Sequence, residues 1–225
     1  MRNQEKDALE MAAKRERILK CGFRIFSERT IEKVSMKDVA DAADVGIATL
    51  YRYYKTKQEL VLAIGTMMWD SFARSYTDEY RRREKTAAEE FDRFLESFLE
   101  LYRNRKDILR FNQFFNVFVA SEKIPPEQLE PYGRVIETLA ARFHEMYVKG
   151  EQDGTMRTDI PEQEIFSGSM HLMLAAVTRY AVGLVYAPPT GHDPEKELVT
   201  LKQLILEEYT KNTTKKQQEK GEKQQ

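Results

Sequence analysis

The residues best suited to specific chemistry lie between positions 45 and 58, where several side chains can donate hydrogen bonds to a polyanion. This stretch carries three basic residues, Arg52, Lys55 and Lys57, and no acidic one, although the whole chain has a formal net charge of −1. Residues 1–60 contain thirteen Lys or Arg and ten Asp or Glu, a difference of +3. A locally basic, acid-free segment on a nearly neutral chain favours selective nucleic-acid binding at one face.

Two short helical patterns and a tight break between them position these residues. Ser35 is an N-cap residue with Asp38 three positions later, which is typical of a capping box. One apolar face then follows at helical spacing, formed by Met36, Val39, Ala40 and Ala43. The segment 44–46 breaks the pattern, because Asp and Gly tolerate the backbone of a sharp turn. Thr56 begins a second capping box, which opens a third helix.

The helix that begins at about Ile47 has two different faces. Leu50 and Tyr54 are predicted to face inward, whereas Thr49, Arg52 and Tyr53 are predicted to face outward. Two short helices joined by a turn of three or four residues form the helix-turn-helix pattern, whose second helix enters the major groove of DNA.

A known family shares these residues together with the preceding helix, predicted from Ala8 to Glu28 after a loose polar arm. The shared positions are Ile18 and Phe26, then Ser35, Met36, Val39, Ala40, Ala43 and Val45, and then Thr49, Leu50, Tyr51, Tyr53, Tyr54, Lys55, Thr56, Lys57 and Leu60. Over residues 12–65 the chain closely resembles the N-terminal domain of TetR/AcrR-type transcriptional repressors. The resemblance implies DNA binding by a dimer and a separate helical domain for a small effector.

The chain departs from the family pattern at three places. Thr30 stands where the family usually has Gly after the first helix, and Asp44 replaces the usual Gly of the turn. The recognition helix opens with Gly46, Ile47 and Ala48 instead of a small hydroxyl residue, a polar residue and Gly. Gly is nearly as good an N-cap as Ser, so the change removes one hydroxyl that could contact a phosphate.

Chemistry and resemblance together assign roles in a predicted DNA site of eight residues: Ser35, Ile47, Ala48, Thr49, Tyr51, Arg52, Tyr53 and Lys57. Thr49, Tyr53 and Lys57 are the phosphate contacts. Ser35 caps its helix and presents backbone N–H groups to a phosphate. Tyr51 and Arg52 contact base edges, and Ile47 and Ala48 contact thymine methyl groups. The alternative is that Tyr51 and Tyr54 are packing residues and Arg52 is merely solvated, and for Tyr54 packing is the preferred interpretation.

The rest of the chain predicts further helices and an all-α fold. The third helix continues to about Arg83, and later helices begin near Thr86, Ile108, Glu127, Pro161 and Asp193. We expect a helix-turn-helix domain at 1–62, a larger antiparallel helical domain for ligand binding and dimerisation at 63–210, and a disordered tail at 211–225.

Nineteen of the 24 aromatic residues follow residue 60, and they have two interpretations. Helical bundles bury aromatic residues routinely, so most of them belong to an ordinary core. A cavity for an apolar or aromatic effector would also need a few polar groups for orientation. The candidate ligand-binding residues are Phe98, Tyr102, Phe111, Asn112, Phe115, Asn116, Phe143, Tyr147 and Met170.

The resemblance implies a homodimer formed through the last two helices, at about 161–210. The helix from Pro161 is apolar on more than one face, which is more than packing on one side requires. Two-fold symmetry would separate the recognition helices by about 34 Å or slightly more, and so predicts a palindromic operator.

The sequence thus predicts a ligand-responsive transcriptional regulator, most simply a repressor, that a small effector releases from its operator. The alternative is an activator or co-activator with weak or no DNA affinity. An enzyme is not expected, since the nucleophile-elbow, zinc-protease, CxxC and phosphate-loop motifs are missing. No cofactor or metal is expected. The single cysteine, Cys21, an N-terminus without a signal peptide and the lack of a membrane-spanning run predict a cytoplasmic protein.

Overall fold

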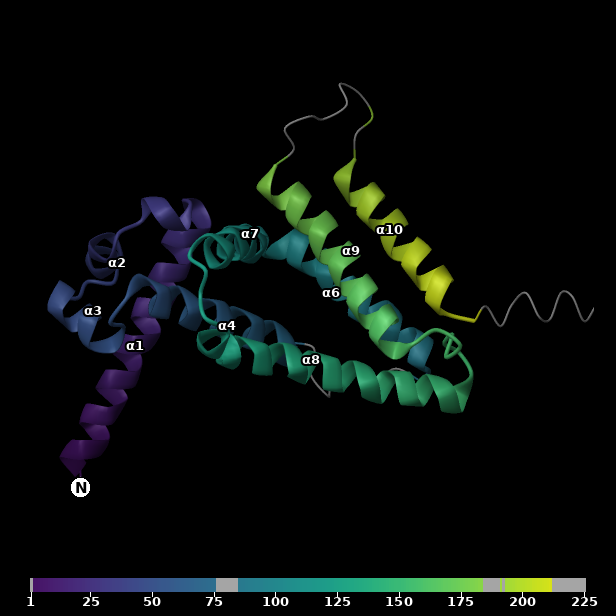
Figure 1. The fold of residues 1–225 in the computed structure, drawn as a ribbon, viewed down its shortest axis with the longest axis horizontal. Coiled ribbons are helices and arrows are strands. Elements are labelled where there is room, and N and C mark those ends of the chain that lie inside the picture. The colour runs from purple at the N-terminus through teal and green to yellow at the C-terminus, as the bar shows by residue number, and fades with distance from the viewer. Residues whose placement is uncertain (1, 76–84, 184–190, 192, 212–225) are drawn as a thin grey trace, which may run out of the picture. The chain divides into compact units, whose positions relative to one another are not determined.

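The computed structural model describes residues 2–75, 85–183, 191 and 193–211. Within these residues the secondary structure is helical, apart from one isolated bridge between Met156 and Thr210 (Figure 1). The elements are α1 (Arg2–Glu28), the 3-10 helix η1 (Ile31–Lys33), α2 (Met36–Ala42), α3 (Ile47–Tyr53), α4 (Lys57–Ser75), α6 (Ala87–Asn104), α7 (Lys106–Ser121), α8 (Pro126–Asp153), α9 (Glu162–Val182) and α10 (Pro194–Tyr209). The all-α prediction is confirmed.

Local sequence signals set several helix starts. Before α6, the hydroxyl of Thr86 accepts a hydrogen bond from the backbone N–H of Glu89 at 3.2 Å, while the Glu89 carboxylate accepts one from the N–H of Thr86 at 3.0 Å. Before α10, the Asp193 carboxylate accepts from the N–H of Glu195 at 3.1 Å, and Pro194 occupies the first turn, where no N–H is needed.

Two helix boundaries bear on the sequence predictions. Helix α1 begins at Arg2 and not at Ala8, so the predicted loose arm is wrong. Residues 2–7 contain neither Gly nor Pro, and Arg, Gln, Glu and Lys among them are good helix formers. Helix α4 is described to Ser75, and its predicted continuation to Arg83 lies outside the described residues, as does the predicted tail after residue 211.

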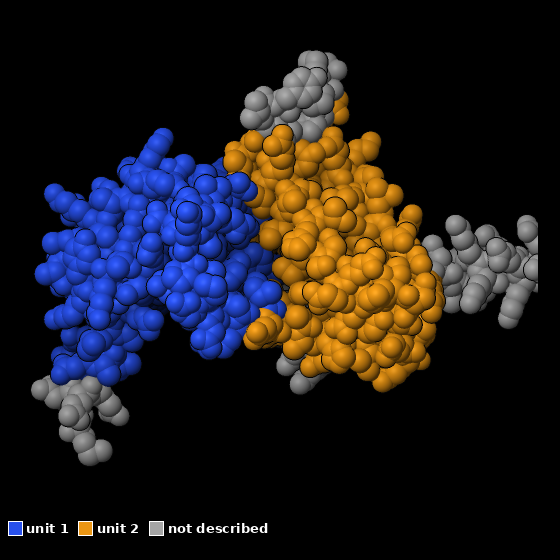
Figure 2. Space-filling view, in the orientation of Figure 1, with its two compact units in different colours: residues 1–72, 106–136 blue, residues 73–105, 137–225 orange. Residues whose placement is uncertain are grey.

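The chain divides into two compact units, coloured separately in Figure 2. Unit 1 contains residues 1–72 and 106–136, and unit 2 contains residues 73–105 and 137–225. Helix α7 and the first turns of α8 therefore group with the N-terminal helices. The functional division at residue 62 stays a prediction.

The core of unit 1 depends on aromatic residues that α7 contributes. Phe111 packs edge-to-face on Phe23 of α1, with ring centroids 5.6 Å apart, and lies 5.8 Å from the ring of Phe115. A Cβ atom added to Gly65 of α4 would lie 2.7 Å from the Phe115 ring, closer than side-chain atoms can pack. Glycine at this position thus allows α4 and α7 to approach each other.

Unit 2 has an aromatic core of its own. Phe143 of α8 contacts Phe91 and Phe94 of α6, with centroids 6.2 and 5.8 Å apart, and Phe166 of α9 at 5.2 Å. Beside this cluster, the buried carboxylate of Glu90 accepts a hydrogen bond from the Lys149 ammonium at 2.5 Å. Buried charges need such a partner, so this pair fixes α6 against α8.

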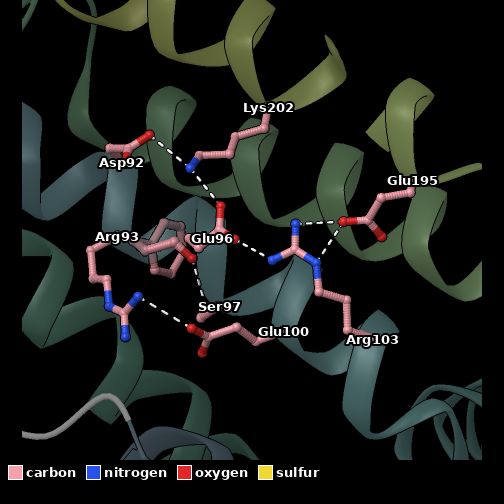
Figure 3. A network of polar contacts seen from close by, with 9 residues as sticks. Asp92, Arg93, Glu96, Ser97, Glu100, Arg103, Glu195 and Lys202 are labelled. Carbon is pink, nitrogen blue, oxygen red and sulfur yellow. Dashed lines mark hydrogen bonds and ion pairs between the residues drawn. The ribbon is translucent and has the colours of Figure 1, made fainter. Parts of the chain in front are cut away.

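A polar network connects α6 to α10 (Figure 3). The Lys202 side chain is 13% exposed, and its ammonium lies 2.8 Å from Asp92 and 2.6 Å from Glu96. Glu96 also pairs with Arg103, which lies 2.5 Å from Glu195 of α10. Partial burial alone would raise the pKa of Glu96, but the hydrogen bonds from Lys202 and Arg103 lower that pKa below its ordinary value.

Candidate nucleic-acid interface

The start of α2 is held by a closed hydrogen-bond pair. The Ser35 hydroxyl accepts from the N–H of Asp38 at 3.1 Å, and the Asp38 carboxylate accepts from the hydroxyl and the N–H of Ser35 at 2.6 and 2.7 Å. These bonds, the side-chain bond first, lower the pKa of Asp38. Because both donors of Ser35 are occupied, its role in this structure is capping, and a phosphate here would meet other N–H groups of the helix start.

The turn between α2 and α3 is formed by Asp44, Val45 and Gly46. Asp44 has a φ of 49°, in the left-handed region that Asp enters more readily than most residues. The N–H of Val45 donates to the Ala40 carbonyl at 3.0 Å. Gly46 then serves as N-cap of α3 without a side-chain bond. Asp therefore replaces glycine in the turn while the helix-turn-helix geometry is retained.

Helix α3 presents four predicted DNA-contacting residues to solvent. Leu50 is fully buried and Tyr54 is 5% exposed, as predicted for the inward face. Ile47 and Tyr51 are 41% and 47% exposed, and Ala48 and Arg52 are exposed as well. Spacings of one, four and five residues place these four side chains on one side of the helix. Thr49 and Tyr53, predicted to face outward, are half-buried.

Two predicted phosphate contacts have partners within unit 1. The Tyr53 hydroxyl donates to the Met11 carbonyl of α1 at 3.3 Å. The Lys57 ammonium, at the first residue of α4, donates to the Glu32 carbonyl at 3.3 Å, and burial lowers the pKa of Lys57. The Lys57 ammonium has two further N–H groups that can donate to a phosphate. The Tyr53 hydroxyl has a single donor, so it would have to break its bond to the Met11 carbonyl before it could donate to a phosphate.

Side chains of helix α1 form hydrogen bonds at both ends of the recognition helix α3. The Arg17 guanidinium donates to the Asp44 carbonyl at 3.1 Å, and Nε of Arg15 donates to the Tyr54 hydroxyl at 3.2 Å. Together with the Tyr53–Met11 bond, these contacts fix both ends of α3 to one long helix. Arg15 and Arg17 carry no sequence signal for this role, because nothing in their spacing distinguishes them from solvated helix residues.

The nine predicted ligand-binding residues are divided between the two units. Phe111, Asn112, Phe115 and Asn116 belong to unit 1, and Phe98, Tyr102, Phe143, Tyr147 and Met170 belong to unit 2.

Several of these side chains are already used in packing or hydrogen bonding. Asn112, 4% exposed, accepts a hydrogen bond from the Trp69 indole at 3.2 Å, whereas Asn116 is exposed. The Tyr147 hydroxyl lies 3.2 and 3.0 Å from the carbonyls of Thr158 and Ile160. Binding of an effector by these residues stays a prediction.

The described residues also bear on two other kinds of site. They contain no group of three or more His, Cys, Asp or Glu side chains placed to hold a metal ion. In the same residues, no helix is long and apolar enough to cross a membrane.

Comparison with known proteins identifies relatives of the region just described. A sequence model of the family described as bacterial regulatory proteins, tetR family, matches residues 18–64. Over 50 residues the chain is 44% identical to the HTH-type transcriptional repressor KstR of Mycobacterium tuberculosis (strain ATCC 25618 / H37Rv), a match that covers 22% of this chain and 23% of that protein. The chain thus spans only about a quarter of the length of the curated relatives it matches, 28% of one and 23% of the other.

Solved structures resemble the chain over most of its length. A putative transcriptional regulator from Saccharomonospora viridis, in complex with choline, has a TM-score of 0.71 at 17% identity and covers 89% of this chain and 100% of its own. FadR of Bacillus subtilis, in complex with stearoyl-CoA, has a TM-score of 0.67 at 14% identity, with coverages of 85% and 97%. These likenesses concern the fold alone.

Proposed function

Because the chain belongs to the tetR family of bacterial transcriptional regulators and carries its DNA-binding helix-turn-helix, we propose that it is a ligand-responsive repressor of a palindromic operator. Residues 1–62 are the DNA-binding domain and residues 63–210 the ligand-binding and dimerisation domain. The repressor role, the operator and the effector are parts of this proposal.

The observation that carries the proposal is the outward side of α3. Ile47, Ala48, Tyr51 and Arg52 form one exposed side, and positions 45–58 contain no acidic residue to repel a phosphate backbone. Arg52 would donate two hydrogen bonds to a guanine, and the alkyl groups of Ile47 and Ala48 would contact thymine methyl groups. Thr49, Tyr53 and Lys57 would contact phosphates on either side.

The proposed dimer forms through α9 and α10. Leu172 and Val182 of α9 and Leu204 of α10 are 50%, 44% and 59% exposed in the single chain. Exposed large apolar side chains on two adjacent helices are typical of a surface that a second copy covers. The symmetric dimer would carry its two copies of α3 to half-sites about 34 Å or slightly more apart.

The proposed effector is a small apolar or aromatic molecule. Relatives of the same fold have been solved with stearoyl-CoA and with choline, which supports a small-molecule role for the helical domain but does not identify a molecule for this chain. The candidates that share unit 2 are Phe98, Tyr102, Phe143, Tyr147 and Met170. An effector would act only through its different affinities for the DNA-bound and free arrangements.

A reporter gene fused to the DNA that flanks the chain's own gene tests the repressor role. The chain should lower expression, and Arg52→Ala should restore it, whereas Arg134→Ala on α8 removes the same charge and should leave repression intact. Increased expression in the presence of the chain would favour an activator, the alternative that the opening of α3 with Gly46, Ile47 and Ala48 supports.

A further inference from the structure

Unit 1 contains a cleft that shares only Tyr53 with the proposed DNA site and no residue with the proposed effector site. It has a volume of about 880 Å³ and lies between α1, the α3–α4 junction and the start of α8. Figure 2 shows a notch in the surface of unit 1 near this place. The size falls within the usual range for small-molecule sites, which is roughly 300–1,000 Å³.

The walls of the cleft come from regular positions on rigid helices. Helix α4 contributes lining residues at spacings of three and four, from Glu59 to Asp70, so that one side of the helix faces the cleft. Its apolar surface is made by Leu62, Ala63 and Met67, and Leu19 and Val135 add to it from α1 and α8. Such a surface would accept the hydrocarbon body of a ligand.

The charged groups around this apolar surface are mostly negative. Glu59, Asp70 and Glu127 line the cleft, and Arg15 is the basic residue among the residues lining it. Nε of Arg15 donates to the hydroxyl of Tyr54. Asp70 has a further interaction of its own, but Glu59 and Glu127 already outnumber the single guanidinium, so the field of the lining favours a cation over an anion.

The aromatic rings that line the cleft also favour a cation as its ligand. Tyr53 and Tyr54 both line the cleft, at the end of α3. The face of a tyrosine ring attracts a cation placed within about 6 Å of its centre. Apolar walls, tyrosine rings and excess carboxylates together fit one chemical class.

We propose that this cleft binds a small organic cation with an apolar body. The carboxylates hold the charge while this side of α4 buries the hydrocarbon. The site belongs to unit 1 and is separate from the unit 2 residues proposed for the effector.

Tetraphenylphosphonium and tetraphenylborate test the proposal, because the two ions have nearly the same shape and opposite charges. Calorimetric titration of the full chain without DNA should show binding of the phosphonium at least tenfold tighter than binding of the borate. The double variant Asp70→Asn/Glu127→Gln should bind the phosphonium about tenfold more weakly, because each partly exposed carboxylate contributes a few-fold. Glu59 is left unchanged, since it accepts from the backbone N–H of Lys55 in the start of α4.

Glu130→Gln is the matched control, since it removes one negative charge from an exposed position of α8 that does not line the cleft. Its phosphonium affinity should equal that of the unchanged chain. Ala63→Phe fills the cleft without changing charge and should also weaken phosphonium binding at least tenfold. Equal affinity for the two ions, no phosphonium binding, or unchanged affinity in both cleft variants would overturn the proposal. Since no DNA is present, none of these results depends on operator binding.

Discussion

Gly65 gives a stringent test of how α7 is joined to the N-terminal helices. Gly65 lies inside α4, where replacing glycine by alanine would ordinarily stabilise a helix by about 1 kcal/mol. The added Cβ would lie 2.7 and 2.9 Å from two atoms of the Phe115 ring, against an optimum of about 3.5–4.0 Å between carbon atoms.

The Phe115 ring cannot move away easily. It is 2% exposed, with its centroid 5.8 Å from that of Phe111 and 5.2 Å from that of Tyr132. Overpacking of a core typically costs about 1–3 kcal/mol, and a ring held on two sides should fall in the upper part of that range. After the helix gain is subtracted, Gly65→Ala should lower the free energy of unfolding by about 1–2 kcal/mol.

Urea denaturation followed by tryptophan fluorescence measures this effect, since the single tryptophan, Trp69, is buried in unit 1. In a Phe115→Leu background the clash is removed, so Gly65→Ala should become stabilising by about 0.5–1 kcal/mol. The two substitutions should therefore be coupled by roughly 2 kcal/mol. The same effect of Gly65→Ala in both backgrounds, or a stabilisation in the original chain, would refute the packing described for α4 and α7.

Three further predictions concern DNA binding, assembly and acid stability. In anisotropy titrations, Lys57→Ala should weaken binding to every DNA sequence and reduce the salt slope by about 1 per copy. Arg52→Ala should reduce the binding free energy by about 1–3 kcal/mol through one base position and leave binding to random DNA little affected. Equal losses on specific and random DNA would contradict this division of roles. Leu204→Glu places a charge on an exposed apolar position of α10 and should shift sedimentation from dimer to monomer; a persistent dimer would exclude this surface. The pKa of Glu96 is lower in the folded than in the unfolded chain, so Glu96 stabilises the fold at pH values above its unfolded pKa. This stabilisation is lost as the pH falls through the folded pKa. Lys202→Met should raise the folded pKa, so that the free energy of unfolding begins to fall at a higher pH during acidification. An unchanged acid profile would show that the contact between Lys202 and Glu96 contributes nothing to this stabilisation.

Local signals made much of the fold predictable. Capping boxes at Ser35 and Thr86 and the N-cap at Asp193 depend on residues within three positions, so the sequence itself contains the whole interaction. The inward positions Leu50 and Tyr54 follow from helical spacing alone, and both are buried.

Long-range packing was not predictable in the same way. The grouping of α7 with the N-terminal helices depends on contacts such as Phe23 with Phe111, 88 positions apart in the chain. The bonds from Arg15 and Arg17 to the recognition helix cross 39 and 27 positions, and surface arginines on a helix give no signal of such partners. The half-buried state of Tyr53 has the same origin, since its hydroxyl partner is the Met11 carbonyl of α1.

The rest of the proposed function depends on the binding of a specific DNA sequence by the exposed side of α3. Its most direct test is an anisotropy titration of the full chain against labelled DNA that flanks its own gene and against a scrambled duplex, repeated over a range of salt concentrations. Binding should be tighter to the flanking DNA than to the scrambled duplex, with a log–log salt slope of about −2 or steeper from two copies of Lys57 alone. Equal affinity for both duplexes, or no salt-sensitive binding at any protein concentration, would contradict sequence-specific binding by α3.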